Sequence, residues 1–228
     1  ALQIRGGRGY ETATSLAARG EPAIALERFL RDSRINTIFE GSSEIMRLFI
    51  AREALDPHLK IGAPVLNKKI DAKERRTLAL KAFRFYAAWY PRQWCPLVFG
   101  LPADLPGPVR KHLRRVKWDS QRLARAMFHA MVRHGPKLER QQMLLGRFVD
   151  IATELFVTTA VCLRWAQLQK QPDSEWQNVS ELAEYFCEKS RVQVNQHFRG
   201  VRKNTDKAGY RVARSVLEKK HLAVEEGM

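Results

Sequence analysis

Cysteine is scarce in this chain of 228 residues, and no two cysteines have CxxC spacing. Any disulfide scheme for Cys95, Cys162 and Cys187 leaves one of them unpaired, so we expect a reducing compartment and buried thiols that act as small apolar side chains. No apolar run approaches the roughly 18 residues that a membrane-spanning helix needs. Proline and glycine, with 10 and 13 residues, are too few for a loop-dominated or collagen-like chain.

The motifs of several enzyme classes are also missing. The six histidines form no HExxH motif and no ligand spacing with cysteine, so we expect no metal site. Neither a GxSxG nucleophile motif nor a phosphate-binding P-loop is present. The glycines of Gly6-Gly7-Arg8-Gly9 follow a predicted helix rather than a strand, which argues against a dinucleotide-binding βαβ unit. The chain opens at Ala1 with no initiator methionine or targeting segment, and we expect it to be a fragment of a larger protein.

Basic residues are abundant. Forty Lys and Arg against 24 Asp and Glu leave a net charge of +16, which favours an anionic partner. Between positions 109 and 140, ten basic residues and two acidic ones leave +8, half of the excess. This segment is either a surface that docks on anionic lipid or a solvated helix face, with Trp118 as a half-buried bundle aromatic. No recognition motif for nucleic acid is visible, so we do not expect nucleic-acid binding.

Apolar periodicity predicts an all-α protein. Ser42 or Ser43 is placed to cap a helix that carries Glu44 in its first turn and stops at Pro57. Four amphipathic segments follow and predict an up-down bundle; they span 74–89, 109–134, 138–168 and, after Pro172 and Asp173-Ser174, a stretch to about 198. Residues 210–219 either form one further helix or fray, and the sequence leaves both alternatives open. We divide the chain into 1–58, a linker over 59–72, and a helical extension over 73–228.

One acidic residue has an unusual setting. Glu40 lies on a turn just before a helix, next to Ile38 and Phe39, which could desolvate its carboxylate and raise its pKa as a general base requires. Gly41 would allow a thioester to approach closely, and the amides at Ser42-Ser43 could hold an anion. A solvated glutamate at a helix start is the alternative interpretation of the same residues.

Four sequence segments favour the general-base interpretation of Glu40, because they resemble, in order, the C-terminal region of acyl-CoA dehydrogenases. They are Gln3-Ile4-Arg5-Gly6-Gly7-Arg8-Gly9-Tyr10, Glu27 to Asp32, Ile38-Phe39-Glu40-Gly41-Ser42-Ser43-Glu44-Ile45, and Arg47 to Glu53. The resemblance covers about the first 58 residues and implies the C-terminal helix bundle of a flavoprotein that functions in fatty-acid β-oxidation. The helical extension is similar to that of very-long-chain members, which are dimers associated with membranes.

The resemblance also implies roles for single residues. Glu40 would remove the α-proton of an acyl-CoA while a hydride passes from the β-carbon to FAD. Gly41 would contact substrate. The implied FAD contacts are Gln3, Gly6 and Gly7, toward the neighbouring subunit, and Ser42 and Glu44. The segment from Glu11 to Leu26 is longer than in most members and is a candidate loop over the adenine end of FAD.

The implied partners are an acyl-CoA substrate, an electron-transfer flavoprotein and a second copy of the chain. We expect a cytoplasmic protein, with the inner face of a membrane as a candidate contact. We also expect a chain of this length to be inactive in isolation. The alternative is a non-catalytic basic helical module that binds a membrane surface or another protein and merely retains the ancestral segment. Flavin reduction that depends on Glu40 would distinguish these two functions.

Overall fold

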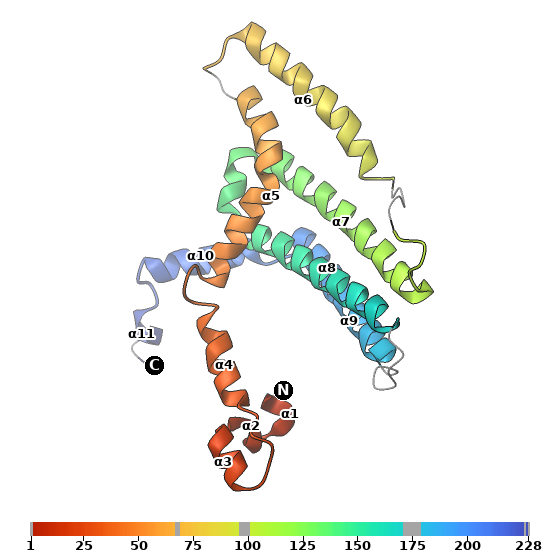
Figure 1. Ribbon diagram of the computed structural model, residues 1–228. Coiled ribbons are helices and arrows are strands. Elements are labelled where there is room, and N and C mark those ends of the chain that lie inside the picture. Colours follow the sequence, from red (N-terminus) through yellow and green to blue (C-terminus); the bar gives the residue numbers. More distant parts are fainter. Residues whose placement is uncertain (1, 67–68, 96–100, 171–178, 226, 228) are drawn as a thin grey trace. The chain divides into compact units, whose positions relative to one another are not determined.

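The computed structural model describes residues 2–66, 69–95, 101–170, 179–225 and 227, and among these it contains helices and no strand (Figure 1). The chain forms two compact units, Ala1–Ile50 and Ala51–Met228. Every element is helical: α1 Leu2–Arg5, α2 Gly7–Tyr10, α3 Ala13–Ala18, α4 Leu26–Ile35, α5 Ser43–Leu66, α6 Ala72–Arg92, α7 Gly107–His134, the 3₁₀ helix η1 Gly135–Arg140, α8 Gln142–Leu168, α9 Val179–Arg202, α10 Asp206–Leu217 and α11 Leu222–Glu225. The predicted all-α class is confirmed.

The second unit is built on three long antiparallel helices, α7, α8 and α9, each packed on its neighbour (Figure 1). The predicted end of α7 at Gly135-Pro136 is confirmed, because Gly135 caps this helix with φ of +50°. Residues 138–141, predicted as part of the next helix, lie in η1 and its cap instead. The predicted start of α9 at Pro172 and Asp173-Ser174 lies outside the described residues.

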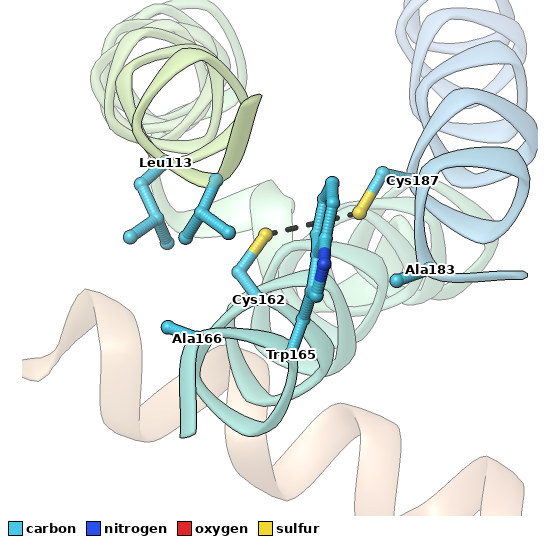
Figure 2. Close-up of a cluster of buried hydrophobic side chains, with 7 residues drawn as sticks. Leu113, Cys162, Trp165, Ala166, Ala183 and Cys187 are labelled. Carbon is cyan, nitrogen blue, oxygen red and sulfur yellow. Dashed lines mark hydrogen bonds between the residues drawn. The ribbon is translucent and has the colours of Figure 1, made fainter. Parts of the chain in front are cut away.

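A tight cluster of small and aromatic side chains joins these three helices (Figure 2). Cys162 of α8 and Cys187 of α9 are buried in it with their sulfur atoms 3.7 Å apart, beside the indole of Trp165. The hydrogen bond with the Cys187 thiol, and then burial, raise the pKa of Cys162 well above its usual range. Both thiols act as small core side chains, as predicted. The same prediction is wrong for Cys95, which is exposed because it lies beyond the last residue of α6, Arg92.

Helix α6 joins the bundle at its C-terminal end. Phe128 of α7 packs against Tyr86, Trp89 and Tyr90 with ring centroids 4.9–5.7 Å apart. Gln121 of α7 donates to the Arg92 carbonyl at 3.2 Å. These contacts account for the predicted helix over 74–89.

Helix α5 does not stop at Pro57, and that prediction is wrong. It continues through Pro57 and Pro64 to Leu66, so most of the stretch that we assigned to a linker is helical. The physical reason lies in packing beyond the proline: His58 stacks on Tyr86 at 5.8 Å and meets Trp89 edge-on at 4.8 Å. Proline removes one backbone donor, but the φ it imposes suits a helix. The division of the chain at 59–72 stays a prediction.

Candidate active site

The turn that carries Glu40 is closed by one hydrogen bond between its two ends and is supported by a second at its start. The Ser43 amide donates to the Thr37 carbonyl at 3.1 Å, and the Thr37 hydroxyl donates to the Arg34 carbonyl at 2.8 Å. The last turn of α4 therefore connects to the first turn of α5 through a short, hydrogen-bonded loop.

Two successive residues at the tip of this loop have positive φ. Glu40 has φ of +55° and Gly41 has φ of +104°. The first value is uncommon for a residue with a side chain and costs about 1–2 kcal/mol. At Gly41 a Cβ atom would lie 3.0 Å from the Met46 sulfur, so glycine suits both the space and the backbone there. Strained residues of this kind concentrate at functional sites.

The start of α5 has the predicted cap. The hydroxyl oxygen of Ser42 accepts from the Ile45 amide at 3.4 Å, and Glu44 lies in the first turn. Because the Ser42 oxygen is the acceptor, its own proton remains available to donate to a ligand. The capping choice between Ser42 and Ser43 thus falls on Ser42.

The side chain of Glu40 is exposed in this chain. Its apolar neighbours do not cover it, since Ile38 and Phe39 are themselves 53% and 47% exposed. The predicted desolvation of the carboxylate by these two side chains is therefore not found within the chain. A dry environment for Glu40 would need a surface that the described residues do not supply.

The glycine-rich loop of the first unit is open. Gly6 has φ of +58° and joins α1 to α2, and a Cβ atom at Gly6 or Gly7 would meet nothing within 4 Å. At Gly9, by contrast, a Cβ atom would lie 2.7 Å from the Leu2 carbonyl, so that glycine allows α1 and α2 to pack. Gln3 is exposed beside this loop.

The longer segment that follows the loop folds back onto it. Glu21 lies 2.7 Å from the Arg8 guanidinium and 3.6 Å from that of Arg5. Within the segment, Thr12 caps α3 by accepting from the Ser15 amide at 3.2 Å. Sequence reasoning missed Glu21, because no helix or strand spacing relates position 21 to positions 5 and 8.

The structure does not bring the two groups of predicted site residues together within one chain. The glycine-rich loop lies at the N-terminal end of α4, whereas the Glu40 turn follows its C-terminal end (Figure 1). Ten helical residues separate them, a rise of about 15 Å. The loop and the turn therefore present two separate surfaces.

No helix among the described residues is long and apolar enough to cross a membrane. No three His, Cys, Asp or Glu side chains in the same part of the chain gather as metal ligands would.

Comparison with known families gives matches over both units. Residues 1–55 match the model of the acyl-CoA dehydrogenase C-terminal domain, and residues 110–222 match that of the ACAD9/ACADV C-terminal domain.

Individual relatives agree with these models. The whole chain is 47% identical to a probable acyl-CoA dehydrogenase, FadE10, of Mycobacterium tuberculosis, and covers 35% of its length. Over 86% of the chain, identity to the bovine very long-chain specific acyl-CoA dehydrogenase is 25%, covering 28% of that protein. The chain thus spans about a third of the length of the curated relatives it matches.

A solved structure shares the fold. The crystal structure of an acyl-CoA dehydrogenase complexed with FAD, from Bacillus anthracis, superimposes with a TM-score of 0.54 at 24% identity. The match covers 96% of this chain and 32% of the other.

Proposed function

Because this chain carries the C-terminal region of the acyl-CoA dehydrogenase family, we propose that it supplies the catalytic base and part of the flavin site of such an enzyme. The observation that supports this most directly is the conformation at the turn: Glu40 and Gly41 both have positive φ, in a loop fixed at both ends by hydrogen bonds. The hydrogen-bonded loop keeps Glu40 in a strained backbone conformation and holds its carboxylate at the tip, as is common at functional sites.

In the proposed reaction Glu40 accepts the α-proton of an acyl-CoA thioester. A thioester carbonyl makes the adjacent C–H bond acidic, and a carboxylate within hydrogen-bond reach can take that proton. Gly41 lets the reacting part of the substrate approach the backbone, because it presents no side chain. The carboxylate of Glu40 is exposed here, which leaves it open to a substrate bound against this face.

The residues expected to contact FAD fit a cofactor that approaches from outside the chain. The backbone at Gly6 and Gly7 is open to close approach, and Gln3 beside it offers an amide. At the other surface, Ser42 retains a donor proton and Glu44 stands exposed in the first helical turn. FAD, when bound, would take up the hydride from the β-carbon of the acyl chain.

The separation of these surfaces supports a shared site in an oligomer. One chain would contribute Glu40 to one flavin and its glycine-rich loop to the flavin of a neighbouring copy, so we propose a homodimer or a larger assembly. The acyl-CoA is the proposed substrate, and an electron-transfer flavoprotein is the proposed acceptor of the electrons.

The test uses the intact dehydrogenase that contains this chain. With Glu40→Gln we expect the purified protein to keep its yellow flavin and to lose flavin reduction by acyl-CoA, followed as bleaching of the flavin absorbance. Glu53→Gln, an exposed residue on α5, is the matched control and should reduce normally. Unchanged reduction in Glu40→Gln would remove Glu40 from the mechanism.

A second candidate function, contact with an anionic membrane surface, is favoured by α6. Leu80 and Phe83 are 51% and 69% exposed on this helix, next to the exposed basic residues Lys81 and Arg84. Apolar side chains that insert at an interface while cations meet lipid phosphates are typical of peripheral helices.

Co-sedimentation with vesicles tests this second function. The full chain should pellet with vesicles that contain anionic lipid and stay in solution with purely zwitterionic ones, and Phe83→Ser should weaken the pelleting. Equal partitioning to both kinds of vesicle would rule the contact out.

A further inference from the structure

A cavity of about 240 Å³ lies in the second unit, between α7, α9 and the residues that follow α6. Three arginines, a histidine and three aromatic rings line this cavity. No acidic side chain of the described residues lines it. The lining residues are Trp94, Trp118, Arg122, Arg125, Ala126, His129, Phe198, Val201 and Arg202.

Arg125 is a buried cation that has no acidic partner among the described residues. It is only 6% exposed, and its guanidinium donates to the Gln93 carbonyl and lies over the rings of Trp94, at 4.1 Å, and Trp118, at 5.4 Å. No carboxylate of the described residues forms an ion pair with it. Buried charges in proteins are normally paired, because removing them from water is costly.

The other two arginines add charge that is only partly balanced. Arg122 shares Asp119, at 3.6 Å, with Arg115, and its second contact is the neutral Asn195 at 3.1 Å. Burial, and then the neighbouring cations Arg115 and Arg202, hold the pKa of Arg122 below its ordinary value despite Asp119. Arg202 extends from the last turn of α9 at the cavity mouth.

Aromatic rings lie under two of the three guanidinium groups, those of Arg122 and Arg125. The N–H groups of these two side chains that make no contact within the protein remain for a ligand. Arg122 lies 3.8 Å above the Phe198 ring. The N–H donors of a guanidinium lie in its plane, so a group stacked on a ring still presents them sideways to a bidentate anion. Trp94, which is 52% exposed, adds an apolar surface at the rim.

We propose that this cavity binds the phosphate group of a small ligand. Three guanidinium groups against one shared carboxylate leave an excess of about two positive charges, which matches a phosphate monoester dianion better than a carboxylate. The volume suits a phosphate with a small apolar body lying against Trp94. A soluble phosphate ester and the headgroup of a phosphatidic acid offer the same chemistry.

The experiment measures binding to the full chain through the fluorescence of its tryptophans and its melting temperature. Inorganic phosphate should shift both with saturation, whereas sodium chloride of equal ionic strength should not. Arg202→Gln should weaken phosphate binding about tenfold, the effect expected from one lost charge-assisted hydrogen bond. Arg199→Gln, which removes an exposed cation from the same last turn outside the cavity, should bind as the wild type does.

Two further arms identify the source of the phosphate. Displacement of inorganic phosphate by glycerol phosphate, with vesicle pelleting that is the same in Arg202→Gln as in the wild type, indicates a soluble ester. Pelleting on vesicles of phosphatidylcholine with phosphatidic acid, lost in Arg202→Gln and kept in Arg199→Gln, indicates a lipid headgroup. The proposal fails if chloride reproduces the effect of phosphate, or if both variants lose binding equally.

Discussion

At position 40 a residue with a side chain holds a backbone conformation that usually belongs to glycine, with φ of +55°. The strain should be measurable as local stability. We expect Glu40→Gly to raise the free energy of opening of this turn by about 1 kcal/mol, because glycine adopts positive φ without the Cβ penalty. Hydrogen exchange of the Ser43 amide, which donates to the Thr37 carbonyl, reports this opening.

Glu44→Gly is the matched control for this prediction. It lies four residues later, in the first turn of α5, and the same substitution there should lower stability by about 1 kcal/mol. Faster exchange in both variants would show that Glu40 is not strained.

The turn around Glu40 has features that the sequence predicts and others that it does not. The string around Glu40 located the turn, its glycine and its cap, because these depend on neighbours in sequence. The conformation of Glu40 is not encoded in any local rule, since glutamate rarely adopts it. The environment of the carboxylate depends on surfaces distant in sequence, and adjacent apolar residues were a poor guide to it.

At the scale of elements, the continuation of α5 through Pro57 depends on a histidine among aromatic rings. Burial lowers the pKa of His58 from its ordinary value near 6.5. The unfolded chain therefore binds the proton more readily than the folded one. Stability is fully present above about pH 6.5 and falls as the pH drops from there to the lower pKa of the folded state.

This predicts a melting temperature of the full chain that falls on mild acidification, together with a change in the fluorescence of Trp89, whose ring lies 4.8 Å from that of His58. His58→Leu should remove much of this dependence on pH, whereas the exposed His221, replaced in the same way, should not. An identical pH profile in His58→Leu would contradict the assignment.

The contacts that attach α10 to α8 include a largely buried ion pair. Arg147 of α8 meets Asp206 of α10 through two bonds of 2.5 and 2.6 Å, and the Asp206 hydrogen bond raises the pKa of Arg147. Because the pair is largely buried, we expect Asp206→Asn to destabilise the attachment of α10 by about 1–3 kcal/mol.

The comparison is Asp104→Asn, which removes an equally short but exposed pair with Lys170, at 2.7 Å. It should change the urea midpoint little, because exposed pairs are worth little. Equal effects of the two variants would mean that burial does not govern the Arg147–Asp206 pair. The sequence left open whether residues 210–219 form a helix or fray, and α10 shows that most of them are helical. No sequence signal linked position 206 to position 147.

For the molecule as a whole, the first unit cannot bury its own apolar residues. Leu16 alone is fully buried among its large side chains within the described residues, while Ile4, Tyr10 and Phe29 are 60–90% exposed. A soluble unit rarely exposes so much apolar surface without a partner. The chain spans about a third of the length of the curated relatives it matches, and we propose that a full-length protein supplies a surface that covers these side chains.

We therefore expect the substitution of one of these side chains to act differently in two contexts. Phe29→Gln should leave the stability of the isolated chain nearly unchanged, because the ring is already in water there, and should reduce its binding of a hydrophobic dye. In a full-length protein with the proposed flavin site, the same change should lower the melting temperature and release flavin, since it would place an amide in a covered apolar contact and leave it without a partner. Isolated wild-type chain should retain no flavin after gel filtration and show no acyl-CoA-dependent reduction. Phe29→Gln without effect on the full-length protein would mean that the Phe29 ring stays open to solvent there.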